Sequence, residues 1–169
     1  TTTLIDQRTT HWTVDPDATA AEFAKKPFWG LVTVHGRFDR FDGSYEVGPG
    51  GATIEFAIDA DSLDTGHATR DKHLRSTDFF HVAEHPQVRF TSTRVHEVTG
   101  GILHVVGHLE AAGAVVQLEF AATVRELDDH ALEIEATTTL DERELGMSSG
   151  RLGMIRPPAT LHVKARLSR

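Results

Sequence analysis

Residues 116–125 read VQLEFAATVR, and apolar and polar side chains alternate along most of this stretch. Val116, Leu118 and Phe120 fall on one side, whereas Gln117 and Glu119 fall on the other. A period of two is typical of a β-strand with one buried face and one solvent-facing face, and it does not fit a helix. The stretch therefore predicts an amphipathic strand.

The same alternation recurs along the chain. Clear examples lie at residues 53–60, 132–139 and 161–168, and weaker ones at 10–14, 19–25, 31–41, 87–95 and 102–111. Turn-forming residues stand between them at Asp42–Gly43, Gly48–Gly51, Gly100–Gly101 and Asp128–Asp129. The best helical candidate is the short, charged connection ATRDKHLRS at Ala68–Ser76. The pattern predicts an all-β fold.

An antiparallel sheet hides its edges most completely by closing on itself. We therefore predict one domain over residues 1–169: a lipocalin-like β-barrel of about eight antiparallel strands with one short helical connection, with a β-sandwich as the alternative. On the faces expected to point inward, small residues stand beside large ones, as Gly36 does next to Phe38 and Gly107 next to Val105. This mixture favours a hollow interior over a packed core whose side-chain sizes match the taper of the barrel.

Composition excludes several classes of function. The 169 residues carry a formal net charge of −8 and no run of basic residues, which argues against nucleic-acid binding. The absence of cysteine excludes disulfides, thiolate metal sites and thiol nucleophiles. The first residues contain neither a signal-peptide pattern nor about 20 consecutive apolar residues, so we expect a cytoplasmic protein without a transmembrane segment. The alternative that a leader sequence was removed stays open, because the sequence starts at Thr1 and not at Met.

Residues 70–93 read RDKHLRSTDFFHVAEHPQVRFTST and resemble the signature of the YceI-like family of lipid-binding proteins. The likeness lies in the Arg-Asp-x-His-Leu run, in Asp-Phe-Phe and in the strand end Phe-x-Ser-Thr, at the spacing of that family. It extends to Trp12, to GRF at 36–38 and to SLDT at 62–65, and so covers nearly the whole chain. The resemblance implies a lipocalin-type barrel that holds polyisoprenoids, isoprenoid quinones or fatty-acid amides in a long internal channel.

The sequence departs from the family pattern at two places. Ala18 and Thr19 stand where the family usually has His-Ser, and Leu145 precedes Gly146 where it often has Phe-Gly. We expect the mouth of the barrel and the choice of ligand to differ accordingly.

We predict that the barrel binds, transports or stores an amphipathic isoprenoid or acyl lipid and that it is not an enzyme. A long apolar tail binds without polar contacts, because each buried CH₂ group contributes roughly 0.8 kcal/mol. No cofactor and no metal are expected. The predicted cavity-lining residues are Val34, Phe38, Ile54, Phe56, Phe79, Phe80, Phe90, Leu103, Val105, Leu118, Phe120 and Ile134.

Two groups of residues are candidates for the mouth. Arg70, Asp71 and His73 could bind a polar headgroup, and Arg70 is suited to a diphosphate. The alternative is an Arg–Asp ion pair that pins the loop. Phe28 and Trp29 are candidates for a portal that admits a lipid tail, or else they cap the core.

Two short motifs match enzyme patterns. HVAEH at 81–85 matches an inverted zinc-peptidase motif, which needs a helix, but Pro86 follows at once and a solvent-exposed turn is expected. GMSSG at 146–150 matches a nucleophile elbow, but Pro157 and Pro158 rule out the helix that should follow. His104 and His108 share an outward face, yet about 13 Å of strand separates them, too far to hold one ion.

Two other functions remain open at this stage. A small-molecule enzyme could use Asp71, His73 or Glu144 for acid–base chemistry, because fold alone does not fix function. A ligand-free structural or stress protein with a filled barrel, with a homodimer as one possible form, is the other alternative. The outward residues are mostly charged, which argues against a large apolar contact face.

Overall fold

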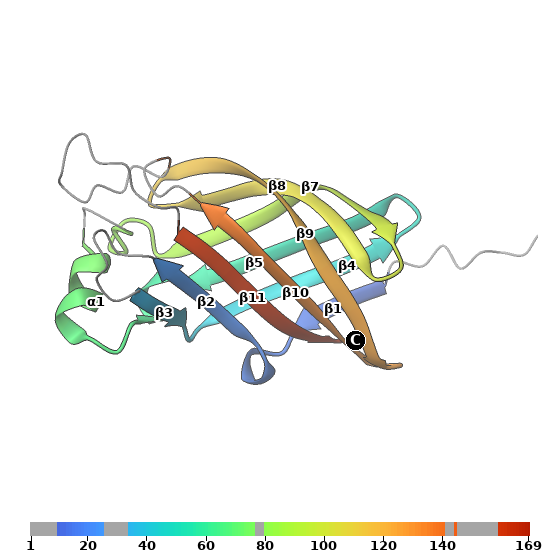
Figure 1. The fold of residues 1–169 in the computed structure, drawn as a ribbon, viewed down its shortest axis with the longest axis horizontal. Coiled ribbons are helices and arrows are strands. Elements are labelled where there is room, and N and C mark those ends of the chain that lie inside the picture. Colours follow the sequence, from blue (N-terminus) through green and yellow to red (C-terminus); the bar gives the residue numbers. More distant parts are fainter. Residues whose placement is uncertain (1–9, 26–33, 77–79, 141–143, 145–158) are drawn as a thin grey trace, which may run out of the picture.

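The computed structural model of the protein describes residues 10–25, 34–76, 80–140, 144 and 159–169, with only the backbone of Lys25 and Val34. These residues form eleven strands, one α-helix and two short 3-10 helices (Figure 1). The elements in chain order are β1 (Thr10–Val14), η1 (Pro16–Ala18), β2 (Ala20–Lys25), β3 (Val34–Phe38), β4 (Phe41–Gly48), β5 (Gly51–Asp59), η2 (Ala60–Ser62), β6 (Leu63–Asp64), α1 (Ala68–Leu74), β7 (Gln87–Thr99), β8 (Ile102–Ala111), β9 (Ala114–Asp128), β10 (Ala131–Leu140) and β11 (Ala159–Ser168).

The strands form one antiparallel sheet that closes, because β1 pairs with both β4 and β11. β1 and β2 lie in one line, since both pair with β11 on one side and with β4 and β3 on the other. β3 continues into β4, and β5 into β6, in the same way. The result is a closed barrel of eight strand lines, which confirms the predicted lipocalin-like fold with its single α-helical connection.

Short interruptions break three of these lines: η1 between β1 and β2, residues 39–40 between β3 and β4, and η2 between β5 and β6. Ser62 joins the last two. Its hydroxyl accepts hydrogen bonds from the backbone N–H groups of Asp39 (3.1 Å) and Arg40 (2.9 Å) and donates one to the carbonyl oxygen of Asp59 (2.6 Å). Because Ser62 is buried, its hydroxyl satisfies backbone groups that the broken sheet ladder leaves unpaired.

One strand prediction and one turn prediction are wrong. The sequence predicts a single strand over 31–41 and a turn at Asp42–Gly43, whereas a bend at residues 39–40 interrupts the strand and β4 runs straight through Gly43. Gly43 is needed for space and not for turning. It pairs with Phe56, and a Cβ atom at this position would lie 2.7 Å from the Phe56 ring. The helix is confirmed but ends at Leu74, two residues before the predicted end.

One end of the barrel interior is filled with side chains, and we call it the closed end. Val95 of β7 pairs with Val105 of β8, and Leu132 of β10 pairs with Leu167 of β11. The guanidinium of Arg169 lies 5.1 Å from the centre of the Trp12 ring. The buried side chains that define the closed end are Trp12, Val95, Leu103, Val105 and Leu132.

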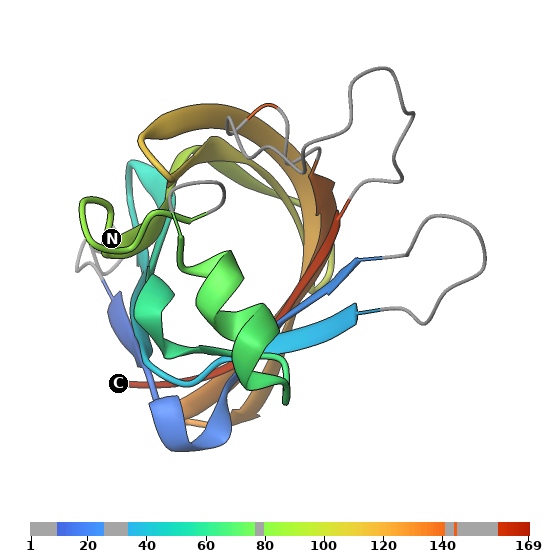
Figure 2. The same cartoon turned by 90° about the vertical axis from the view of Figure 1, so that its left-hand side faces the viewer.

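Helix α1 lies across the opposite end of the barrel, which we call the helix end (Figure 2). The imidazole Nδ1 of His67 caps the helix by accepting the backbone N–H of Arg70 at 3.2 Å. The Arg75 side chain donates to the carbonyl oxygens of Asp61 (3.1 Å) and Leu63 (2.7 Å). These bonds tie the last turn of α1 to η2 and β6, and so fix the helix over the rim.

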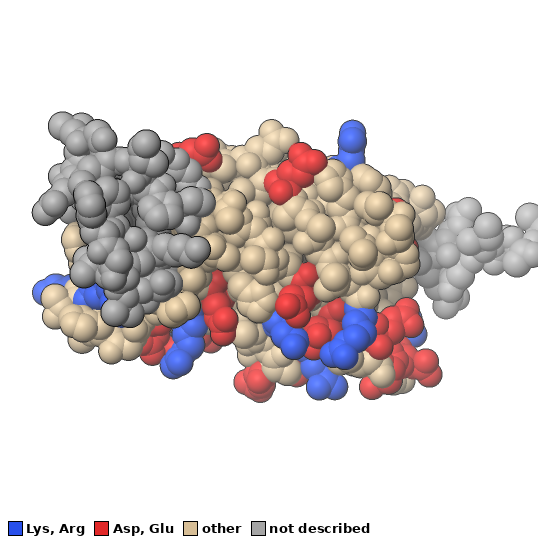
Figure 3. Space-filling view, in the orientation of Figure 1, with Lys and Arg blue, Asp and Glu red and all other residues tan. Residues whose placement is uncertain are grey.

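Acidic and basic side chains are interspersed on the lower part of the face shown in Figure 3. A typical exposed pair is Arg37 with Asp39, whose charged atoms lie 2.9 Å apart. Exposed pairs of this kind contribute little to stability, about 1 kcal/mol or less. Among the helices that the structure describes, none has the length and apolar character needed to cross a membrane.

Candidate functional site

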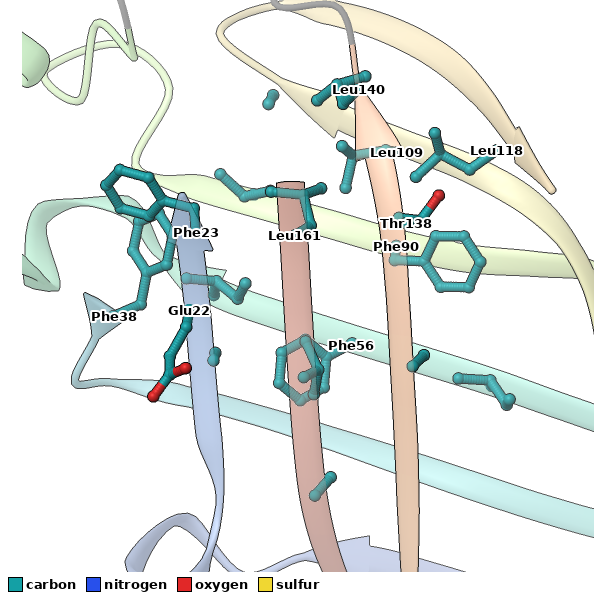
Figure 4. Close-up of a pocket in the computed structure, with 18 of the residues that line it drawn as sticks. Glu22, Phe23, Phe38, Phe56, Phe90, Leu109, Leu118, Thr138, Leu140 and Leu161 are labelled. Atoms are coloured by element: carbon teal, nitrogen blue, oxygen red, sulfur yellow. The ribbon is translucent and has the colours of Figure 1, made fainter. Parts of the chain in front are cut away.

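A cavity of about 440 Å³ occupies the interior between the closed end and α1. Its wall comes from the inward side chains of the barrel strands, and Figure 4 shows Phe56, Phe90 and Leu161 pointing into the same space. The volume falls within the range of roughly 300–1,000 Å³ that is usual for ligand sites. The apolar side chains of its lining are Val14, Ala21, Phe23, Phe38, Ile54, Phe56, Ile58, Leu74, Phe80, Val88, Phe90, Leu109, Ala111, Leu118, Phe120, Ala122, Ile134, Ala136, Leu140, Ala159, Leu161, Val163, Ala165 and Leu167.

Glycines in the wall explain how the interior stays open despite its many aromatic rings. The ring of Phe23 lies where a side chain at Gly36 would be, on the paired strand. A Cβ atom at Gly107 would lie 2.6 Å from the Phe90 ring and 2.5 Å from the carbonyl oxygen of Thr91. Each ring therefore occupies the place of a missing side chain in the wall, and the centre of the barrel is left free.

The aromatic rings also contact one another along the wall. Phe23 and Phe38 have ring centres 5.4 Å apart, and the Phe80 ring meets Phe38 edge-on at 5.8 Å. On the other side, the centres of Phe90 and Phe120 are 5.3 Å apart. Such pairs are each worth about 0.5–1.5 kcal/mol beyond the burial of their surface. They give the cavity a stable apolar lining.

Few polar groups reach the cavity. Ser44 and Thr138 contribute hydroxyls, and Glu22 and Glu55 are exposed residues of the lining; the Glu22 carboxylate lies 3.7 Å from the His162 imidazole. Burial raises the pKa of the Tyr45 phenol, and the negative charge of Glu97 raises it further. The environment of Tyr45 thus disfavours a negative charge, and the cavity is suited to an uncharged chain.

Arg70 and His73 bring polar side chains to the cavity from α1. The Arg70 guanidinium donates to the Thr65 hydroxyl (2.8 Å) and to the Thr65 carbonyl oxygen (2.9 Å). The buried Asp71 carboxylate accepts the Thr65 backbone N–H (3.0 Å) and the Thr65 hydroxyl. Among the described residues, Arg70 and Asp71 thus meet through Thr65 and form no direct ion pair of the kind weighed from the sequence.

The structure brings most of the predicted lining residues together. On the cavity wall lie Phe38, Ile54, Phe56, Phe80, Phe90, Leu118, Phe120 and Ile134. Leu103 and Val105 are buried at the closed end and do not line the cavity. Of the candidates at the mouth, Arg70 and His73 line the cavity and Asp71 does not. Phe28, Trp29, Phe79 and the side chain of Val34 lie outside what the structure describes. The part of all these residues in binding stays a prediction.

Some lining residues are absent from the predicted set. Leu161 and Val163 fall on the inward face of a strand whose alternation is clear in the sequence, so the signal for them was present. Phe23 gave no such signal, because β2 is short and the residues two positions before and after it are Ala21 and the charged Lys25. Its position follows from the pairing with Gly36, which is a tertiary contact.

The residues weighed for catalysis are dispersed. Asp71 and His73 both lie on α1, but only His73 lines the cavity, since the Asp71 carboxylate is hydrogen-bonded to Thr65; Glu144 is exposed and does not line the cavity. His104 pairs with Glu119 at 2.6 Å on the outer face of β8 and β9. The GMSSG motif at 146–150 lies outside the described residues, and HVAEH forms a turn before β7.

A closed antiparallel barrel with an apolar internal cavity defines the lipocalin-like class of fold. Within this class, the model of the YceI-like domain matches residues 12–167, and the chain belongs to the YceI-like family.

Curated relatives share about a third or more of their residues with the chain over the matched stretches. A UPF0312 protein of Pectobacterium atrosepticum is 38% identical over 96 residues, which are 55% of this chain and 50% of the relative. A UPF0312 protein of Pseudomonas aeruginosa is 33% identical over 126 residues, or 70% of this chain and 65% of the relative. The chain thus matches half to two thirds of the length of these relatives.

Solved structures share the fold at low sequence identity. The crystal structure of Burkholderia cenocepacia BcnA superposes with a TM-score of 0.81 at 17% identity, over 90% of this chain and 98% of BcnA. A polyisoprenoid binding domain from Saccharophagus degradans gives a TM-score of 0.75 at 16% identity, over 93% of this chain and 97% of that domain. At these identities the likeness shows the fold alone.

Proposed function

We propose that the barrel binds the apolar chain of an isoprenoid or acyl lipid in its internal cavity and that it carries or stores this lipid without catalysis. The observation that carries the proposal is a cavity of about 440 Å³ whose wall is almost entirely apolar. The family of the chain and the name of its polyisoprenoid-binding structural neighbour support the same ligand class.

The energetics favour an apolar chain over a polar ligand. Roughly ten buried CH₂ groups would contribute about 8 kcal/mol, which corresponds to a micromolar Kd before ordering costs are subtracted. A polar ligand would lose its bonds to water and find few replacements on this wall, at a cost of about 1–3 kcal/mol for each unpaired group.

The ligand's polar end belongs at the helix end of the cavity. Arg70 and His73 line the cavity there, and the bonds to Thr65 hold the Arg70 guanidinium in place. The tail then extends past Phe56 and Leu161 toward the closed end, where buried side chains stop it. In this orientation the polar headgroup meets the charged side chain of Arg70, and the apolar wall surrounds the lipid chain.

Native mass spectrometry of the purified protein, followed by solvent extraction and lipid identification, tests the proposal. We expect a bound isoprenoid or acyl species. The Ala136→Trp variant places a large ring inside the cavity, so its lipid occupancy should fall at least tenfold. Thr137→Trp is the matched control, because it adds the same ring to the neighbouring exposed position.

Two outcomes would contradict lipid binding. One is a ligand-free wild-type protein that, once folded, takes up neither an added isoprenoid quinone nor a fatty-acid amide. The other is equal uptake by Ala136→Trp and Thr137→Trp, which would place the lipid outside the cavity. The native mass also decides between a monomer and the homodimer that the sequence leaves open.

A further inference from the structure

The turn after α1 brings together three side chains that the lipid cavity does not use: His81, Glu84 and His85. Each offers one ligand atom, and these atoms all lie within 4.8 Å of one another. Both histidines are half-buried, and Glu84 is exposed. Imidazole nitrogens and a carboxylate oxygen are ligands that Zn²⁺ takes in proteins, whereas Mg²⁺ and Ca²⁺ prefer oxygen ligands alone.

The backbone of the turn builds this cluster. The carbonyl oxygen of His81 accepts the N–H groups of Glu84 (3.2 Å) and His85 (2.9 Å), which closes a single helical turn. Residues three and four positions apart on such a turn lie on one side of it. His81 has a φ of +48°, a left-handed value that non-glycine residues rarely adopt. The turn is also tied to the end of α1, because the His81 N–H donates to the Ser76 carbonyl oxygen at 2.9 Å.

The position of the His85 ring is set by a neighbouring hairpin. Its Cε1 and Nε2 atoms lie 2.9 Å from the place where a Cβ atom at Gly113 would be. Gly113 lies in the turn between β8 and β9, so the missing side chain makes room for the imidazole. The rings of His81 and His85 are nearly perpendicular, at 79°, with centres 5.5 Å apart. The fold thus holds both imidazoles close together before any ligand arrives.

We propose that His81, Glu84 and His85 bind one divalent transition-metal ion of the Zn²⁺ type, with the fourth coordination position open to water. Bonds of about 2.0–2.1 Å to a tetrahedral ion place its ligand atoms about 3.4 Å apart. The ligand atoms now lie within 4.8 Å of one another, and metal binding would draw them closer through rotation of the three side chains. The sequence predicts a turn here and no metal site, and it is the shape of this turn that gathers the ligand atoms.

The peptidase function of the same motif does not follow from this site. That chemistry places the two histidines and the glutamate on a helix, and here Pro86 ends the turn and β7 begins at Gln87. We therefore infer a binding site at the rim of the barrel. Phe80, the residue directly before His81, lines the cavity, so the proposed site lies next to the cavity wall.

A second pair of histidines offers an internal control. His96 and His104 face each other across β7 and β8, with ring centres 5.0 Å apart. His104 is also hydrogen-bonded to Glu119, yet these three side chains do not form a ligand cluster of the kind found at 81–85 within the described chain. The His96→Ala variant therefore removes an imidazole pair without touching the proposed site.

The test is calorimetric titration of Zn²⁺ into the whole, chelator-treated protein, with Co²⁺ absorption as a spectroscopic readout of coordination. We expect one equivalent of Zn²⁺ to bind to the wild type. His81→Ala and His85→Ala should each weaken binding at least tenfold, and the exposed change Glu84→Gln should weaken it several-fold. His96→Ala should bind as the wild type does.

Circular dichroism of each variant checks that it is folded. Should either histidine variant fail to fold, Glu84→Gln still decides, because its side chain is exposed and only the carboxylate charge is lost. The proposal is overturned if the wild type binds no Zn²⁺ at 100-fold molar excess of metal, or if Glu84→Gln binds it unchanged. It is also overturned if His96→Ala, and not the variants of the turn, abolishes binding.

Discussion

The closed end and the helix end of the barrel are made of similar apolar residues, but only the closed end is filled. At the closed end, Val105 is fully buried and pairs with Val95, and Gly50, Gly51, Gly100 and Gly101 of the nearby hairpins have no aromatic ring within 4 Å of the place of a Cβ atom. Toward the helix end, rings such as Phe23 and Phe90 lie over glycines in the wall. The difference teaches that the choice of hydrophobic residues does not make a barrel hollow. The placement of glycines beside aromatic residues does.

The sharpest test of this comparison makes the same change at both ends. Leu103→Ala removes a side chain that is only 5% exposed and surrounded by packed neighbours, so it should lower the free energy of unfolding by about 3 kcal/mol. Leu161→Ala removes the same atoms from a side chain that already borders the cavity. It should cost less than about 2 kcal/mol, because no new enclosed void forms.

Denaturant unfolding of delipidated protein measures both values. Equal losses for Leu103→Ala and Leu161→Ala would mean that the helix end is as tightly packed as the closed end. Added lipid should narrow this gap by raising the cost of Leu161→Ala, since a bound chain would contact Leu161 and not Leu103.

A second test asks whether the glycines of the wall are equivalent. Gly107→Ala would press a methyl group against the backbone carbonyl of Thr91, which cannot move away without breaking the sheet, and should cost about 2–3 kcal/mol. The three atoms nearest to a Cβ at Gly36 all belong to the ring of Phe23, and we expect this ring to turn into the cavity in Gly36→Ala. This substitution should cost about 1 kcal/mol or less in stability.

Lipid uptake should not follow stability in these variants, because Gly36→Ala has the smaller stability loss and is still expected to lose uptake. In Gly36→Ala the displaced Phe23 ring takes up part of the cavity, so lipid uptake should fall even though the protein stays folded. Undiminished uptake in a folded Gly36→Ala protein would show that this glycine does not keep the cavity open.

The smallest expected effect concerns Tyr45 and alkaline pH. The pKa of its phenol is raised above the ordinary value of 10.0, chiefly by burial, so the folded protein holds this proton more tightly than the unfolded chain does. This contribution to stability is complete below pH 10 and is lost as the pH rises through the folded-state pKa. Wild type should therefore lose stability above pH 10 more steeply than Tyr45→Phe. Parallel curves would indicate a water-filled cavity around the phenol.

Sequence alternation predicted the barrel well, because a strand with one wet face repeats every second residue. The strands at 53–60, 132–139 and 161–168 were found close to their predicted bounds. The interruptions of the strand lines could not be read in this way. Ser62 looks like an ordinary polar residue in the sequence, and its role depends on Asp39 and Arg40, which only the folded chain brings near.

The cavity was predicted in kind but not in extent. Small residues on the inward faces, such as Gly36 and Gly107, indicated a hollow interior, yet alternation along a strand does not say which end of the barrel is filled. Leu103 and Val105 therefore entered the predicted lining although they lie at the closed end. Their depth along the barrel axis depends on the stagger between strands, which is a property of the whole sheet.

The pairing of β1 with β11 has a consequence for how the molecule comes into being. Thr13 lies opposite Ser168, so the seam of the barrel joins the two extremes of the described chain. Contacts between residues so distant in sequence form late and slowly, because a long loop must be ordered first. During synthesis, β1 and β10 keep unpaired edges until β11 leaves the ribosome, and such edges invite pairing with other chains. The enclosed interior therefore forms only once β11 has joined β1, β2 and β10 in the sheet.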